Sequence, residues 1–132
     1  MHLKIDTKER FSILRPLVSH IDDNMADELA ALCLNYLNKN VKNIILNLNQ
    51  ISLIDVKATK IIIKLQKFFY KKNASFIICE LKAPIKENIE KSEFFEFFNY
   101  APTESEASDI IQMEEIEREL LGNEDEISGS KH

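Results

Sequence analysis

Residues 55–60 combine a carboxylate, a hydroxyl and two ammonium groups at the point where a predicted strand gives way to a predicted helix. Asp55 is placed to cap that helix, because its carboxylate can accept hydrogen bonds from the free amides of the first helical turn. Its replacement by alanine would then cost about 1 kcal/mol of stability. An exposed turn at the end of a core strand is also a natural docking surface. These residues indicate binding chemistry, with Asp55 as either a cap or a contact.

The sequence offers no set of residues for catalysis. His2 and His132 lie near the two ends and His20 falls in a predicted loop, so spacing suggests no Ser/His/Asp or Cys/His set. The only glycines, Gly122 and Gly129, form no phosphate-binding loop, and no HExxH motif or paired-cysteine spacing is present. We therefore expect a protein that is not an enzyme and that uses no cofactor, nucleotide or metal.

The composition of the chain is that of one soluble globular domain. It has 132 residues, of which 45% are hydrophobic and 30% charged. The sequence contains no apolar run of about 18 residues to span a bilayer, and its first residues lack the apolar block of a signal peptide. We therefore expect a cytoplasmic protein that does not insert into a membrane. Cys33 and Cys79 lie in apolar periodic segments, which predicts buried free thiols.

Charge is distributed unevenly along the chain, whose net charge is −5. Residues 1–80 carry 12 basic and 8 acidic side chains, whereas residues 81–132 carry 5 and 14. Such a dipolar surface can steer a charged partner or keep the protein soluble. Because the net charge is negative and no aromatic residues alternate with the lysines, we expect no binding of nucleic acid.

The clearest periodic signals lie on either side of residue 55. Residues 41–48 form a nearly continuous apolar run, which is typical of a strand covered on both faces. From Ala58 onward apolar residues recur at threes and fours, which predicts an amphipathic helix with a basic outer face. The predicted buried residues are Ala58, Ile61, Ile62, Leu65, Phe68 and Phe69, and the basic ones are Lys57, Lys60, Lys64, Lys67 and Lys71.

Before this strand, residues 3–6 and 11–14 alternate in polarity and predict a hairpin, with the second strand ending near Pro16. Residues 22–24 then offer caps for an amphipathic helix that ends near residues 38–40.

After the basic helix, residues 75–80 predict another core strand, and Pro84 suits the first turn of a further helix. The aromatic cluster in residues 94–100 is expected to anchor the core. A last helix is predicted at residues 104–121, with a capping box formed by Thr103 and Glu106. Residues 122–132 are polar and are expected to form a disordered tail, which leaves residues 1–121 as the domain. The alternation of strands and helices implies a largely parallel sheet.

The order of these elements and two sequence segments resemble the STAS domain, and within it the anti-sigma factor antagonists. The first segment is IILNLNQISLID at residues 44–55, which is similar to the family's core strand and its approach to the turn. The second is SFIICELKAPIKENIEKSEFFEFF at residues 75–98, which is similar to the next strand and its proline-marked helix. The likeness covers residues 1–121. It implies an α/β fold with a central mixed sheet of about four to five strands and about four helices, packed mainly on one face.

The turn itself departs from the family pattern, in which the residue after the aspartate is a serine or threonine that a partner kinase phosphorylates. Here residues 55–58 read DVKA, and Val56 has no hydroxyl to phosphorylate. A phosphate at that position would add about −1.5 to −2 charges at the helix N-terminus. Ala58 replaces a glycine of the family. Ser52 and Thr59 carry nearby hydroxyls, but the family uses the position of Ser52 structurally and Thr59 falls within the helix.

The resemblance implies a module that docks an anti-sigma factor or a GHKL-type, switch-kinase-like protein through this turn and the following helix. The predicted partner-binding residues are Asp55, Val56, Lys57, Ala58, Thr59 and Lys60, together with Asp22 and Asp23. The last two are included because the corresponding loop lies near the turn in STAS folds, although both could be simple caps. The alternative is a structural subunit that braces a transporter ATPase, or a homo-oligomeric scaffold. A homodimer through exposed apolar residues of the last helix, such as Met113, is also open.

Overall fold

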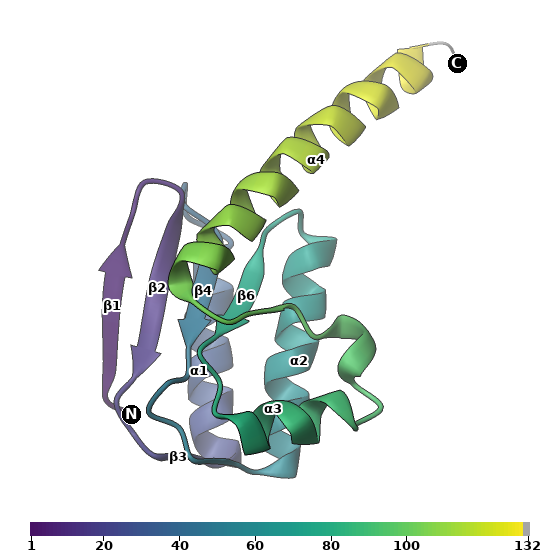
Figure 1. The fold of residues 1–132 in the computed structure, drawn as a ribbon. Coiled ribbons are helices and arrows are strands. Elements are labelled where there is room, and N and C mark those ends of the chain that lie inside the picture. The colour runs from purple at the N-terminus through teal and green to yellow at the C-terminus, as the bar shows by residue number, and fades with distance from the viewer. Residues whose placement is uncertain (131–132) are drawn as a thin grey trace.

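The main sheet of the protein has five strands in the order β1-β2-β4-β6-β7 (Figure 1). The computed structural model describes residues 1–130, and it describes the surroundings of side chains in residues 1–122. The strands are β1 (Leu3–Thr7), β2 (Phe11–Pro16), β3 (His20–Ile21), β4 (Asn43–Asn47), β5 (Leu53–Ile54), β6 (Phe76–Cys79) and β7 (Tyr100–Ala101). The helices are α1 (Asp23–Tyr36), α2 (Val56–Lys71), α3 (Ala83–Glu90), the 3-10 helix η1 (Phe95–Phe97) and α4 (Glu104–Ser130). β3 and β5 form a separate two-stranded sheet.

The sheet is mixed, as the sequence predicts. β1 and β2 form the expected antiparallel hairpin, with Leu3 opposite Pro16, and β2 ends at Pro16. The strands β2, β4, β6 and β7 are parallel to one another. All five residues of β4 are buried, because this central strand has helices over both of its faces.

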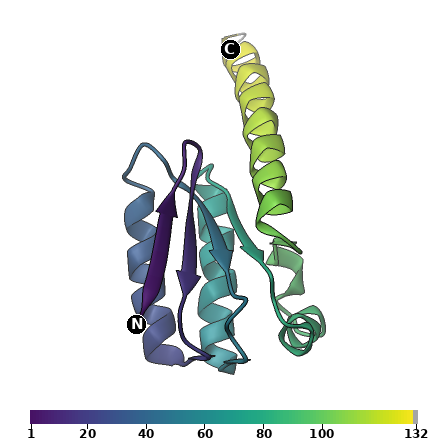
Figure 2. The same cartoon turned by 60° about the vertical axis from the view of Figure 1, so that its left-hand side comes forward.

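Two apolar cores lie on opposite faces of the sheet, since successive residues of a strand point to opposite sides. Ile44 and Leu46 face the larger core, which α1, α2 and α3 cover. Ile45 faces a smaller core, which contains Ala107 and Ile111 of α4. Figures 1 and 2 show α1 and α2 on one side of the sheet and α4 on the other. Three of the four α-helices therefore lie toward one face, which confirms the predicted arrangement.

Helix α2 begins at Val56 and is rotated slightly from the predicted orientation. Ile63 and Gln66 are buried, whereas Phe68, predicted to be buried, is 42% exposed. The buried Gln66 amide donates hydrogen bonds to the main-chain oxygens of Phe76 at 3.0 Å and Asn99 at 2.8 Å. The rotation thus places the Gln66 amide beside β6, where these main-chain oxygens need hydrogen-bond donors.

The prediction that the aromatic cluster anchors the core is wrong for two of its members. Phe95 and Phe97 lie in η1 and are 50% and 40% exposed. Phe94 and Phe98 are half-buried against the larger core, and the ring of Phe98 stacks on Tyr100 with centroids 5.5 Å apart. Because the segment crosses the surface as a short 3-10 helix, its two outer rings, Phe94 and Phe98, pack inward and the two rings within the helix are exposed.

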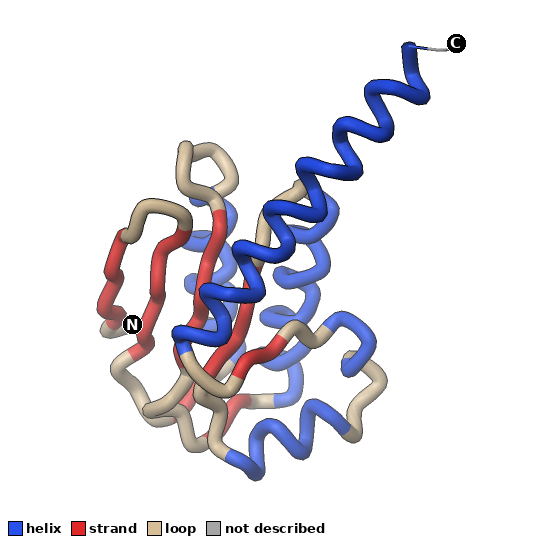
Figure 3. Tube along the Cα trace, turned by 45° about the horizontal axis from the view of Figure 1, so that its top comes forward, coloured by secondary structure: helices blue, strands red, loops and turns tan. Residues whose placement is uncertain are grey.

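Helix α4 begins with the predicted cap, since the Thr103 hydroxyl accepts a hydrogen bond from the Glu106 amide at 3.1 Å. It spans Glu104–Ser130 and so continues past the end predicted at residue 121, projecting beyond the sheet (Figure 3). The division into a domain of residues 1–121 and a disordered tail stays a prediction, and residues 131–132 of that tail lie outside the described residues.

None of the described helices combines the length and the apolar character needed to cross a bilayer. The cytoplasmic location expected from the sequence stays a prediction.

Candidate functional site

The small sheet of β3 and β5 brings two distant segments together at the start of α2. His20 pairs with Leu53 and Ile21 with Ile54. The amide of Asp55 donates to the main-chain oxygen of Ile21 at 3.1 Å, which fixes the turn beside the start of α1. The expected proximity of the Asp22 and Asp23 loop to the turn follows from this pairing.

Asp55 occupies the N-cap position of α2, but its side chain makes no capping hydrogen bond. Its Oδ1 atom instead lies 2.7 Å from Nε2 of His20, and the two side chains are 40% and 47% exposed. The expectation that the carboxylate caps the helix is therefore wrong. Its main-chain oxygen, however, accepts from the amide of Thr59 at 2.9 Å and from the Thr59 hydroxyl at 3.1 Å.

Two apolar side chains stand out from this turn. Val56 is 74% exposed at the first position of α2, and Leu53 is 54% exposed on β5. Lys57 is exposed beside them. A protruding pair of aliphatic groups next to an ammonium group is suited to contact with a protein surface, where the apolar area would be removed from water.

The other predicted site residues of α2 are less accessible. Ala58 is fully buried, so the prediction that it contacts a partner is wrong, and a larger side chain would clash with the core. Thr59 is half-buried, with its hydroxyl bonded to the helix main chain. Lys60 is half-buried and its ammonium lies 5.4 Å from the centre of the Phe94 ring.

A groove of about 240 Å³ continues the exposed turn toward α3. Val56 and Leu53 line it on one side, and Pro84, Asn88 and Phe94 line it on the other. The ammonium of Lys82 lies 3.0 Å from the Ser52 hydroxyl near its edge. The sequence alone does not indicate the α3 side, because only the fold brings residues 84–94 next to the turn.

Asp22 and Asp23 differ in their roles. The Asp22 carboxylate caps α1 by accepting from the amide of Met25 at 2.9 Å, which confirms it as a cap. Asp23 lies in the first turn of α1, and its buried Oδ1 atom has no hydrogen-bond partner within the described part of the chain. Near the turn, Asp23 therefore differs from Asp22 in having a buried carboxylate oxygen without a partner in this part of the chain.

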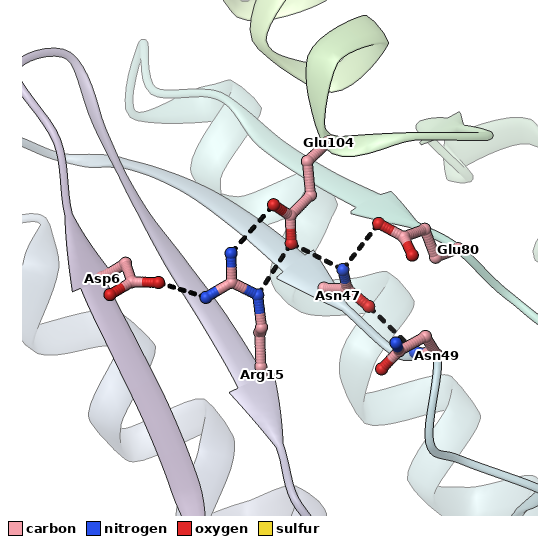
Figure 4. A network of polar contacts seen from close by, with 6 residues as sticks. All are labelled: Asp6, Arg15, Asn47, Asn49, Glu80 and Glu104. Atoms are coloured by element: carbon pink, nitrogen blue, oxygen red, sulfur yellow. Dashed lines mark hydrogen bonds and ion pairs between the residues drawn. The ribbon is translucent and has the colours of Figure 1, made fainter.

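A second polar cluster, which the sequence did not suggest, lies between the sheet and α4, on the face of the sheet opposite to α1 and α2 (Figure 4). Arg15 donates to the carboxylate of Glu104 through Nε at 2.8 Å and Nη2 at 2.9 Å, and it also donates to Asp6. Asn47 donates to Glu104 at 2.6 Å and to Glu80 at 2.8 Å. This network fastens the first turn of α4 to strands β1, β2 and β4.

The same network sets the protonation of its acids. The hydrogen bonds from Arg15 lower the pKa of Glu104, against an opposing effect of burial. Arg15 likewise lowers the pKa of Asp6. Both carboxylates are held in their charged form as partners of Arg15, which is the chemistry of a structural ion-pair network.

The two cysteines are free and buried, as predicted. Burial raises the pKa of Cys33 to about 12 and that of Cys79 to about 12. Such thiols stay protonated at neutral pH and are poor nucleophiles.

This α/β fold, with an exposed turn between a small parallel sheet and a helix, is that of a STAS domain, and the chain belongs to the STAS domain family. Residues 2–107 match the family model described as STAS domain. A search of curated protein sequences finds no match to the chain.

Solved structures with low sequence identity share the fold. An anti-sigma factor antagonist protein of Thermotoga maritima, TM1081, has a TM-score of 0.73 at 17% identity, and the alignment covers 83% of this chain and 94% of that one. SpoIIAA of Bacillus, an anti-sigma factor antagonist solved in unphosphorylated and phosphorylated forms, has a TM-score of 0.63 at 15% identity, covering 84% and 98%. Part of the murine anion transporter Slc26a9 aligns with a TM-score of 0.66 at 14% identity, covering 79% of this chain and 18% of the transporter.

Proposed function

We propose that the protein is a regulatory module that acts by binding another protein through the turn of residues 55–59 and the adjoining groove. The partner class is an anti-sigma factor or a GHKL-type, kinase-like protein. Membership of the STAS family and the similarity in fold to anti-sigma factor antagonists support this proposal.

The observation that carries the proposal is the exposure of Val56. Its side chain is 74% exposed, although removal of an isopropyl group from water lowers the free energy. Leu53, at 54% exposure, extends the apolar area, and the groove of about 240 Å³ beside it offers space for a side chain of the partner. A partner that covers these groups would bury them together.

The charges at the turn favour a partner with acidic groups. Lys57 and Lys64 are exposed along the basic face of α2, and Lys60 is half-buried between them. Residues 55–64 contain one acidic side chain, Asp55, against three lysines, so the charge of this segment is positive. Complementary carboxylates on the partner would speed association and fix its orientation.

The binding would not be switched by phosphorylation at the family position. Val56 lacks a hydroxyl, the Ser52 hydroxyl is paired with Lys82, and the Thr59 hydroxyl donates to the helix main chain. We propose that the module stays competent to bind without this control.

We also propose that the protein is not an enzyme. His20 and Asp55 form an exposed pair at the turn, but no serine, threonine or cysteine side chain hydrogen-bonds to His20 within residues 1–122. A nucleophile in contact with the histidine is what such a pair needs for acyl transfer.

Affinity purification from the native cell tests the proposal, with the wild-type chain, Val56→Asp and the control Leu34→Asp. Leu34 is an apolar residue near the end of α1 that is 40% exposed, so the control adds the same charge away from the turn. We expect the wild type and Leu34→Asp to retain an anti-sigma factor or a GHKL-type protein that Val56→Asp loses. Retention by all three would contradict docking at the turn.

A structural subunit that braces a transporter ATPase, or a homo-oligomeric scaffold, is the second candidate function. The similarity in fold to part of an anion transporter favours the first of these, a subunit associated with a transporter. In that case a transporter ATPase would be recovered equally with the wild type and with Val56→Asp.

A further inference from the structure

Helix α4 carries apolar side chains on two sides. Ala107 and Ile111 are buried against the sheet. Met113, Ile116 and Leu120 recur at spacings of three and four, and they are 60%, 49% and 60% exposed. Because successive residues of an α-helix are about 100° apart, this outer stripe faces away from the side that packs on the sheet. No side chain of residues 1–122 buries it.

Acidic residues border the outer stripe. Glu106 and Glu117 are exposed and lie at helical positions beside it, and the exposed Asp109, about one turn before Met113, lies in line with it. Carboxylates in this arrangement repel nucleic-acid phosphates and anionic lipid head groups. The charges therefore favour a protein surface that presents both apolar and basic groups.

The chain itself offers such a surface. A groove of about 490 Å³ lies between α2, the η1 segment and the inner side of α4. Tyr70 and Phe97 line it and are 77% and 40% exposed. Lys67 and Lys71 also line it, and the ammonium of Lys67 lies 4.3 Å from the centre of the Phe97 ring. The exposed rings complement the apolar stripe, and the two ammonium groups of α2 complement its acidic borders, although Glu96 of η1 also lines the groove.

The outer stripe of a given α4 cannot enter the groove of its own chain. The inner side of α4 already lines that groove through Glu114, whose carboxylate accepts from the Ser75 hydroxyl at 2.6 Å and the Asn99 amide at 3.0 Å. Only a second molecule can bring Met113, Ile116 and Leu120 to it.

We propose that two copies of this chain associate, with the outer stripe of each α4 seated in the groove between α2 and η1 of the other. Twofold symmetry makes the two contacts equal and closes the dimer. The alternative of α4 packed on α4 would oppose acidic borders, which is unfavourable. The contact uses Lys67, Tyr70 and Lys71 in the C-terminal half of α2, and it is separate from the turn proposed for partner binding.

Sedimentation velocity of the full chain over a range of concentrations tests this proposal, with two charge-reversed variants. One carries Asp109→Lys and Glu117→Lys on α4, and the other carries Lys67→Glu and Lys71→Glu on α2. We expect the wild type to dimerise, and each variant alone to show a dimer dissociation constant raised at least about tenfold. Mixed in equal amounts, the two variants should regain the wild-type dimer, because both contacts then join opposite charges.

Ile116→Ser provides a variant without charge change and should also weaken the dimer about tenfold, while circular dichroism checks that every variant is folded. A chain that stays monomeric at all concentrations would overturn the proposal. So would a dimer that persists in both charge-reversed variants. If that dimer weakens only in Ile116→Ser, the pattern indicates α4 packed on α4, because like charges would face each other both before and after the reversal.

Discussion

The carboxylate of Asp55 turns away from the helix that follows it and meets Nε2 of His20 at 2.7 Å. The pair joins the end of β5 to β3, although 35 positions separate the two residues in the chain. The first turn of α2 is consequently left without a side-chain cap, and Val56 and Leu53 stand exposed next to it. The turn therefore exposes apolar side chains and lacks a side-chain cap that would close the end of the helix.

The stability cost of removing Asp55 should therefore be smaller than that of removing a true cap. We expect Asp55→Ala to lower the free energy of unfolding by less than about 0.5 kcal/mol, because exposed ion pairs contribute little. Asp22→Ala, which removes a carboxylate that does cap α1, should cost about 1 kcal/mol. Urea unfolding of both variants measures the difference, and equal losses would contradict this account of the turn.

Replacement of Gln66 should be costly, because its buried amide donates hydrogen bonds to two main-chain oxygens. Gln66→Met keeps the length of the side chain but leaves the main-chain oxygens of Phe76 and Asn99 without this donor. The loss should be about 1–3 kcal/mol, the cost of leaving a buried polar group unsatisfied. Urea denaturation provides the value, and a variant as stable as the wild type would show that water replaces the amide.

The stability of the fold should depend on the ionisation of Glu104. Because its pKa is lower in the folded protein than in the unfolded chain, charged Glu104 stabilises the fold at pH values above about 4.3. That contribution is lost as the pH falls through the folded-state pKa. Between pH 5 and pH 3, the free energy of unfolding should therefore fall less in Glu104→Gln than in the wild type. This window is set by the ordinary glutamate pKa of about 4.3. Equal losses of stability in the two proteins would rule out a contribution from Glu104. Asp6 would then remain as the acid whose pKa is lowered by Arg15.

Both thiols should be unreactive in the native protein. Their pKa values of about 12 and their burial leave almost no accessible thiolate at pH 8. A disulfide reagent should modify neither Cys33 nor Cys79 until denaturant is added, after which both should react. Rapid modification of either thiol in the native state would show that the residue is accessible.

Local patterns predicted most of the fold. The run of residues 41–48 identifies the buried strand β4, and the spacing of apolar residues after residue 55 identifies α2. What the sequence could not show are contacts between distant segments. The pairing of His20 with Asp55 and the bonds of Arg15 to Glu104 depend on how the strands are ordered in the sheet.

The sequence predicts where the candidate turn lies better than it predicts which residues are exposed there. The turn at Asp55 follows from the change of period, and Val56 proved to be its most exposed apolar group. Ala58, however, is buried because it lies on the inner side of the first helical turn. The α3 side of the groove was missed, since Pro84 is near the turn only in the folded chain.

The most direct test of the central claim is the dissociation constant of the recovered partner, measured by calorimetry for the wild type, Val56→Asp and Leu34→Asp. If the turn is the docking surface, Val56→Asp should weaken binding at least about thirtyfold, as expected for the loss of a central contact of about 2 kcal/mol, and Leu34→Asp should match the wild type. Equal dissociation constants for all three proteins would show that the partner binds elsewhere.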